Sequence, residues 1–289
     1  ADTDFAKVVK NINASGVDDE NVIELCADIT LTGNHTLKRS TTIKSKDEDR
    51  KISMNGSNAG ITVTGEKTVL NLGAKGYDKK LTIEGDGDAK IQVAFVTVSE
   101  EATANMYENV TLQNRKSTGN AYVLVTGSDP VTGSKSVFNM KGGVIEGGSR
   151  AVIAKSGATF NMSGGEIRNC RGGSGNGGGV HVYGATFVMS GGTISGCTAA
   201  IGNGGGLCAE NSSTITISGG TISGCEGVLG GGLYADNSTV TINKGTISGC
   251  TAVDNGGGLY ADNSTITISG GTISGCKGVW GGGLYAENS

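Results

Sequence analysis

The residues of this chain that have the chemistry for a site recur at a nearly fixed spacing in its second half. Cysteines stand at 170, 197, 225, 250 and 276, so that successive spacings are 27, 28, 25 and 26 residues. A period of this size is the mark of a solenoid, in which each repeat packs only against its neighbours. Equivalent residues of adjacent turns then lie ~4.8 Å apart and form columns.

The cysteine column has two interpretations. Stacked thiols are suited to redox chemistry or to binding soft metals, but metal sites usually contain closely spaced pairs such as CxxC, and the repeats contain none. Cysteine also behaves as a small buried hydrophobe. We therefore predict a structural core ladder without a cofactor, formed by Cys170, Cys197, Cys225, Cys250 and Cys276.

A second column is acidic and consists of Glu210, Asp236, Asp262 and Glu287. A divalent cation between stacked carboxylates would relieve their repulsion. The alternative is a polar turn, because each acid is followed by an asparagine, which tolerates left-handed backbone and can form an amide ladder. The asparagines are Asn211, Asn237, Asn263 and Asn288. We favour the turn, and so predict no metal site.

A third column should point outward from the sheet and comprises His181, Cys208, Tyr234, Tyr260 and Tyr285. Stacked tyrosines on an exposed sheet would offer a platform for sugar rings or a partner protein, or would cover the sheet without binding anything.

The loops after the cysteines differ between repeats, and binding specificity usually lies in such loops. They span 171–176, 198–203, 226–229, 251–255 and 277–280. Leu229 and Trp280 stand at apolar loop tips. Trp280 is the first candidate for a contact residue, although it would also fit over the adjacent glycine corner.

The strands follow from the alternation of apolar and polar residues. In the repeat 214–239 we expect strands at 215–218, 221–225 and 232–235, with Ile215, Ile217 and Leu233 pointing inward. Glycines between these segments mark corners. The pattern predicts an all-β fold, a parallel β-helix with three strands per coil and about 25–28 residues per coil.

The chain divides into three parts by pattern. Residues 1–20 should form a cap, since Phe5, Val8, Val9 and Ile12 have helical spacing in 3–13. Residues 21–137 are expected to form irregular coils of the same body, with a separate small β domain as the alternative. Residues 138–289 hold the regular repeats and end in mid-repeat, which leads us to expect a chain truncated at its C-terminus.

Composition excludes some functions. The net charge is −4 without a Lys/Arg cluster, which gives no support to nucleic-acid binding. Apolar runs fall short of the ~20 residues that span a membrane. Paired acids in a recognisable hydrolase motif are missing, and His35 and His181 stand in unrelated contexts. We therefore expect a protein that is not an enzyme.

The repeats resemble those of right-handed parallel β-helix surface proteins of the pectin-lyase-like superfamily, with adhesin-like and polymorphic outer-membrane-protein-type repeats. The likeness lies in GGGLYA at 230–235 and 256–261, and in the opening DDENVIELCADITLTGNHTLKRSTTIKS at 18–45.

The resemblance implies a secreted bacterial protein at the cell surface, acting as an adhesin or stalk. Its partner would be a host-cell protein, an extracellular-matrix protein or a glycan, and any membrane or wall attachment would come from sequence beyond this chain. One alternative is a polysaccharide lyase or hydrolase. Another is an ice-binding array formed by the pairs Thr214/Thr216, Thr239/Thr241 and Thr265/Thr267.

Overall fold

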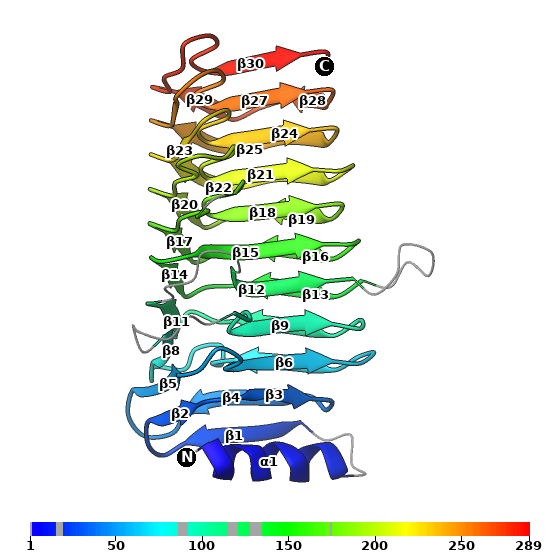
Figure 1. The fold of residues 1–289 in the computed structure, drawn as a ribbon, viewed down its shortest axis with the longest axis vertical. Coiled ribbons are helices and arrows are strands. Elements are labelled where there is room, and N and C mark those ends of the chain that lie inside the picture. Colours follow the sequence, from blue (N-terminus) through cyan, green and yellow to red (C-terminus); the bar gives the residue numbers. More distant parts are fainter. Residues whose placement is uncertain (1, 16–19, 86–91, 115–120, 128–134, 174) are drawn as a thin grey trace.

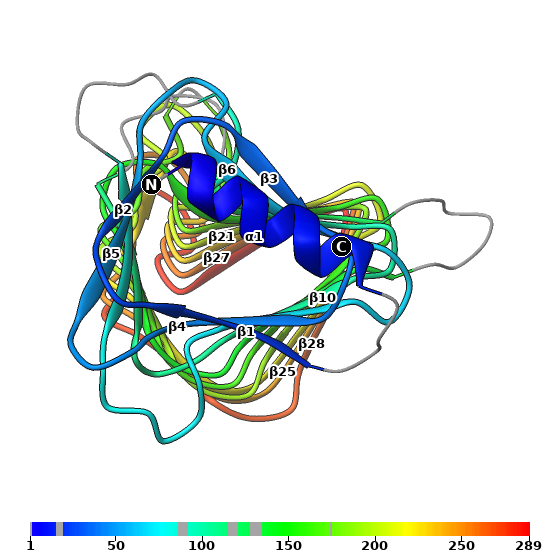
Figure 2. The ribbon, with the colours of Figure 1, turned by 90° about the horizontal axis from the view of Figure 1, so that it is seen from below.

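The computed structural model describes residues 2–15, 20–85, 92–114, 121–127, 135–173 and 175–289. Its strands stack in coils along one long axis, with a single helix across the lower end (Figure 1). Viewed along that axis, the coils enclose a roughly triangular interior (Figure 2). The coils of the first half and those of the repeats share the same sheets, so the described part of the chain is one continuous body.

Each coil contributes a strand to each of three faces in turn, and all pairings between coils are parallel. The first face consists of β1 (Asn21–Leu25), β4 (Thr41–Ser45), β7 (Val69–Leu72), β10 (Thr103–Met106), β13 (Val137–Met140), β16 (Thr159–Met162), β19 (Thr186–Met189), β22 (Thr214–Ser223), β25 (Thr239–Ser248) and β28 (Thr265–Ile268).

The second face consists of β2 (Ile29–Leu31), β5 (Arg50–Met54), β8 (Leu81–Gly85), β11 (Val110–Gln113), β14 (Val144–Glu146), β17 (Glu166–Arg168), β20 (Thr193–Ser195), the later parts of β22 and β25, and β29 (Thr272–Ser274). The expected break between 215–218 and 221–225 is therefore wrong for these two coils. There β22 and β25 run through the glycine corner, with register shifts on either side of Ser218.

The third face is a ten-stranded sheet. It consists of β3 (Asn34–Leu37), β6 (Gly60–Thr64), β9 (Val96–Ser99), β12 (Ala121–Thr126), β15 (Arg150–Lys155), β18 (Val180–Tyr183), β21 (Leu207–Glu210), β24 (Leu233–Asp236), β27 (Leu259–Asp262) and β30 (Leu284–Glu287). Two short strands, β23 (Glu226–Gly227) and β26 (Thr251–Ala252), pair at the corner before it.

The interior holds one continuous apolar core. Ile215, Ile217 and Leu233 are buried, as the alternation predicts. Phe138, Phe160 and Phe187 stack inside the first face with ring centroids 5.2 and 5.0 Å apart. Four cysteines of the ladder are fully buried and Cys276 is half-buried, and all five are free thiols. The column thus packs as small hydrophobes, and the hydrogen bond with the Cys170 thiol together with burial holds the pKa of Cys197 far above its usual range.

An amide ladder exists, but in a different column from the one expected. Asn237 and Asn263 have the left-handed backbone, while their amides donate to the carboxylates of Asp236 and Asp262 instead of to each other. The real ladder lies on the first face, where the amide of each asparagine after the first donates to the asparagine one coil earlier over 2.8–3.0 Å; its members are Asn71, Asn105, Asn139 and Asn161.

Helix α1 (Asp2–Ala14) lies across the first coil (Figure 2). It buries Phe5 and Val9 against that coil, and the Asp2 carboxylate accepts a 2.6 Å hydrogen bond from His35. Val8, expected on the buried side, is 42% exposed. The helix shields the open edge of the first coil, which would otherwise pair with other chains. In the described residues, helices lack the combination of length and hydrophobicity that membrane crossing requires.

In the regular repeats, the glycine directly before the third-face strands β21, β24 and β27 permits close contact between coils. An added Cβ at Gly232 would lie 2.6 Å from the carbonyl oxygen of Gly258 and 2.8 Å from Ile247 Cγ2. Gly206 and Gly258 have the same environment one coil away on either side. These positions therefore require glycine for reasons of space, not of backbone angle.

Replacing Gly232 by alanine should accordingly lower the free energy of unfolding by about 2 kcal/mol or more. Gly33→Ala is the matched control, because a Cβ there would meet nothing within 4 Å. That variant should stay within ~0.5 kcal/mol of the parent. Urea unfolding followed by circular dichroism measures both, and equal stabilities of the two variants would contradict the packing of the corner.

Candidate functional site

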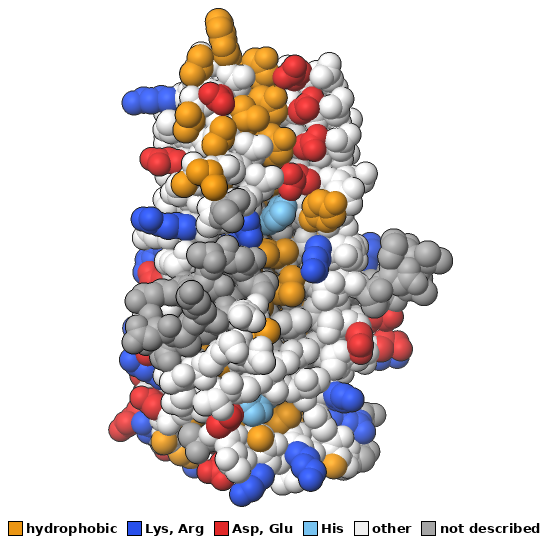
Figure 3. All heavy atoms as spheres, in the orientation of Figure 1, with side chains coloured by type: hydrophobic (Ala, Val, Ile, Leu, Met, Phe, Trp, Pro, Cys, Tyr) orange, Lys and Arg blue, Asp and Glu red, His pale blue; other side chains and the backbone are white. Residues whose placement is uncertain are grey.

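The outward side of the third face combines the columns that sequence analysis selected. One outward column pairs residues in register from coil to coil: Ile153, His181, Cys208, Tyr234, Tyr260 and Tyr285. A second outward column, two residues along each strand, contains Lys155, Tyr183, Glu210, Asp236, Asp262 and Glu287. Figure 3 looks onto this side, with the acids in a row beside apolar side chains.

The tyrosines form a continuous stack that is not exposed. Ring centroids lie 5.5 Å apart between Tyr234 and Tyr260 and 5.4 Å apart between Tyr260 and Tyr285, with the planes within 11° of parallel. Tyr234 is 9% exposed and Tyr260 is 6% exposed. Of the two alternatives for this column, the exposed platform is therefore wrong, because the glycine of the preceding loop lies close to each tyrosine and Leu229 packs against the column.

Stacking also uses the ring faces that a sugar would need. The rings between two neighbours have both faces covered, and Cys208 lies beside Tyr234 in the same cluster. Burial, with the hydrogen bond of the Tyr260 hydroxyl to Glu287, raises the pKa of Tyr260 to about 12. This column therefore serves as packing beneath the loops.

Three of the last four of these loops expose apolar side chains, whereas the tip of the loop 226–229 is half-buried. Ile201, Val253, Val279 and Trp280 are 67–71% exposed, and we name these four the loop-tip ridge. Backbone hydrogen bonds join the loops, among them Val228 N to Gly202 O at 2.8 Å and Asp254 N to Val228 O at 2.9 Å. Trp280 thus points to solvent instead of covering a glycine corner. Residue 174, within the expected loop 171–176, lies outside the described residues.

Most acids of the second column bond to their neighbours. Asp236 and Asp262 each accept the amide of the following asparagine, and Glu287 accepts the Tyr260 hydroxyl. Glu210 differs, because it is brought together with His181 and Cys208. One potential ligand atom from each of these three side chains lies within 4.8 Å of the other two.

The three residues form what we call the His–Cys–Glu cluster. His181 Nε2 lies 2.7 Å from Glu210 Oε2, and the Asn176 amide donates to Glu210 Oε1 over 2.8 Å. Arg150 Nε donates to the carbonyl oxygen of Asn176 over 2.8 Å. Cys208 is fully buried, whereas the side chains of His181 and Glu210 are 19% and 21% exposed. Solvent therefore reaches two of the three groups.

Electrostatics distinguish the members of the cluster. The hydrogen bond from His181, reinforced by its charge and by Asn176, lowers the pKa of Glu210 despite partial burial. Burial and the nearby Glu210 carboxylate raise the pKa of Cys208 well above its usual range. Because the thiolate is the nucleophile, this thiol is unreactive unless something replaces its proton.

Sequence analysis selected His181 and Glu210 in separate columns and did not select Arg150 or Asn176. The signal for the pair was available, since a residue on one strand and the residue two places further on in the next coil share one outward side. Arg150 has no counterpart in the other repeats, and Asn176 recurs before the glycine triplet as Asn203 and Asn255, so neither position indicates a role beside His181.

Comparison with known proteins agrees with this architecture. A family model described as a right-handed β-helix region matches residues 131–289, more than half of the chain. The chain belongs to the right-handed β-helix family. This match and the parallel coils confirm the predicted fold class. Neither the curated proteins nor the solved structures gave a match to the chain.

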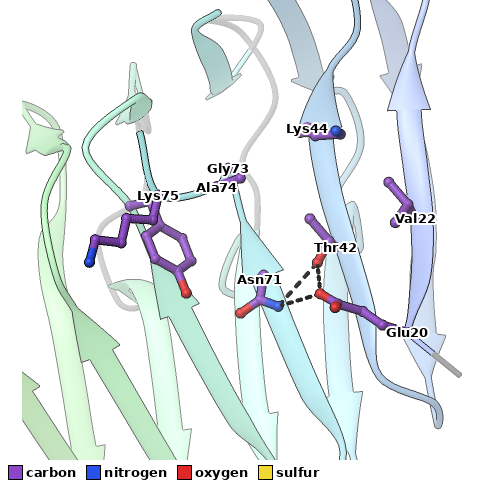
Figure 4. A pocket seen from close by; sticks show the side chains of 9 residues that line it. Glu20, Val22, Thr42, Lys44, Asn71, Gly73, Ala74 and Lys75 are labelled. Atoms are coloured by element: carbon purple, nitrogen blue, oxygen red, sulfur yellow. Dashed lines mark hydrogen bonds between the residues drawn. The ribbon is translucent and has the colours of Figure 1, made fainter. Parts of the chain in front are cut away.

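The β-helix also has a hollow of about 250 Å³ on the first face of its irregular half (Figure 4). There Glu20 accepts hydrogen bonds from Thr42 at 2.7 Å and Asn71 at 3.3 Å. Glu20 is the one carboxylate among its described lining residues, and the cations are Lys44 and Lys75. Glycoside hydrolysis requires two carboxylates across the scissile bond, and the described lining residues of this hollow supply one of them.

The threonine pairs lie in register on the first face of the β-helix. Thr214, Thr239 and Thr265 form one column and are exposed, while Thr216 and Thr241 in the parallel column are half-buried.

The lowered pKa of Glu210 predicts a pH-dependent contribution to stability. A depressed carboxylate pKa stabilises the fold above the unfolded value near 4.5 and loses this effect as the pH falls through the folded value. The stability difference between the parent and Glu210→Gln should therefore be greatest at neutral pH and shrink towards about pH 3. Urea unfolding at several pH values measures it, with His181→Gln as the control that should lose most of the same pH dependence. A difference that is constant with pH would contradict the pairing.

Proposed function

We propose that this β-helix is a non-enzymatic adhesin or stalk of the cell surface or extracellular space, and that it binds a protein partner through the loop-tip ridge. The observation that supports the proposal is the ridge itself, which holds four largely exposed apolar side chains on three loops that backbone hydrogen bonds connect through the loop 226–229. Contiguous exposed apolar residues on a folded protein are typical of interaction sites. Tryptophan is one of the residues enriched among the energetic hot spots of protein interfaces.

A protein fits this surface better than a glycan does. Sugar recognition relies on open aromatic faces, and the tyrosine rings use theirs to stack on one another. The ridge is otherwise aliphatic, with Ile201, Val253 and Val279 offering no side-chain hydrogen bonds to hydroxyl groups.

The charges on this side of the molecule restrict the class of partner protein further. The acids Asp236, Asp262 and Glu287 run beside the ridge on the same side of the molecule (Figure 3). A partner with an apolar patch next to lysine or arginine side chains would match both features. Such charges mainly increase the rate of association and make it sensitive to salt.

Two other functions have weaker support. A polysaccharide lyase or hydrolase would have to work without a second carboxylate in the hollow around Glu20. An ice-binding surface would rest on threonine pairs in three coils, and outward threonines are common in strands generally.

The test is binding of the chain to a panel of immobilised extracellular-matrix proteins and host-cell surface proteins, with a glycan array in parallel. Trp280→Ala should weaken binding to the responsive protein at least tenfold, about 1.4 kcal/mol, by raising the dissociation rate. Added salt should slow association.

Tyr183→Ser is the matched control, because this aromatic residue is 48% exposed on the same face but outside the ridge. It should bind as the parent does. Binding to glycans alone, equal affinity of Trp280→Ala and parent, or no binding to any member of either panel would each count against the proposal.

A further inference from the structure

The His–Cys–Glu cluster has the composition of a metal site that neither the family match nor the sequence assigns. It unites an imidazole nitrogen, a thiol sulfur and a carboxylate oxygen from the neighbouring strands β18 and β21. We propose that His181, Cys208 and Glu210 bind a zinc ion. The proposal is independent of the proposed partner binding and departs from the sequence-based expectation of no metal.

The donor set selects the metal. A thiolate with an imidazole favours zinc over magnesium or calcium, which prefer oxygen ligands alone. Three protein ligands of this mixed kind are typical of zinc sites that keep a fourth position for water or another donor. The partial exposure of His181 and Glu210, 19% and 21%, lets such a donor reach the ion.

The geometry needs little change to accept the ion. Tetrahedral zinc with its usual bond lengths separates its ligand atoms by roughly 3.3–3.8 Å. His181 Nε2 and Glu210 Oε2 are now 2.7 Å apart around a shared proton, and all three ligand atoms lie within 4.8 Å of one another. Zinc in place of that proton would move the imidazole and carboxylate apart by about 0.6 Å or more, which small side-chain rotations supply.

Neighbouring groups hold the ligands in position. The Asn176 amide fixes Glu210 Oε1 and leaves Oε2 for the metal, which is the outer-shell support usual at zinc sites. Arg150 in turn holds the carbonyl of Asn176.

Charge also balances. On binding, Cys208 releases its proton to solvent, and His181 exchanges its Nε2 proton with solvent so that a neutral imidazole with its proton on Nδ1 binds through Nε2. Zinc with one thiolate and one carboxylate then has no net charge, and the nearby Arg150 guanidinium is not repelled.

The outward column changes composition at the cluster. Its last three coils hold stacked tyrosines, whereas His181 and Cys208 stand directly before the first of them. A fully buried Cys208 beside a carboxylate gains only a weak S–H hydrogen bond without a metal. An ion bound by three side chains would account for this change of residue type.

Equilibrium dialysis of the metal-free chain against zinc chloride, with elemental analysis, tests the site. Cys26→Ser serves as the background, because Cys26 is an exposed thiol able to bind zinc adventitiously. We expect about one zinc per chain, and cobalt(II) in its place should give a thiolate-to-metal charge-transfer band. His181→Gln, Glu210→Gln and Cys208→Ala should each weaken zinc binding at least tenfold and remove or shift the cobalt band.

Cys225→Ala, which removes a buried thiol of the core ladder, is the matched control and should leave binding unchanged. His181→Gln and Glu210→Gln alter partly exposed side chains, so they keep the test decisive even if Cys208→Ala unfolds; circular dichroism verifies folding. Absence of zinc above background would overturn the proposal, as would zinc and a cobalt spectrum that His181→Gln and Glu210→Gln leave unchanged. The cluster would then be a hydrogen-bonded network only.

Discussion

The whole structure depends on parallel backbone hydrogen bonding between coils in register. Because each strand pairs with the equivalent strand one coil away, every side chain packs against the side chains at the same position in the coils above and below it. The residues of one column must therefore be compatible in size and chemistry. This requirement explains the buried cysteine and phenylalanine columns, the asparagine ladder and the glycines at the corner. It also explains why the stacked carboxylates of the acidic column each lie beside a hydrogen-bonding partner, which is an amide, a hydroxyl or an imidazole.

Sequence periodicity predicted much of this fold. Fixed spacing with alternating apolar residues gave the coil, the three faces and the inward Ile215 and Leu233. The periodicity did not reveal the asparagine ladder, which runs from the irregular coils into the repeats, since Asn71, Asn105, Asn139 and Asn161 are separated by 34, 34 and 22 residues. These asparagines pair across coils of unequal length, and a search for one fixed period does not find such a column. The glycine corner that β22 crosses without a break was equally hidden.

The candidate site was predictable only in part. Column assignment placed Tyr234, Tyr260 and His181 on one outward side, but not the loops that fold over the tyrosines. Burial by a loop depends on how that loop bends back, and its local sequence does not determine this. The repeats therefore provide a rigid support, and the candidate sites lie where the copies differ: at the loop tips and at the two coils that hold His181 and Cys208 in the column where the last three coils hold tyrosine.

Hydrogen exchange followed by mass spectrometry tests most directly whether one in-register stack unites the irregular coils with the repeats. The account predicts that amides of β7 and β10 exchange as slowly as those of β24 and β27, with protection falling only gradually towards the ends. Rapid exchange throughout residues 21–114 beside full protection of 207–262 would contradict it, because the two halves would then be separate folding units.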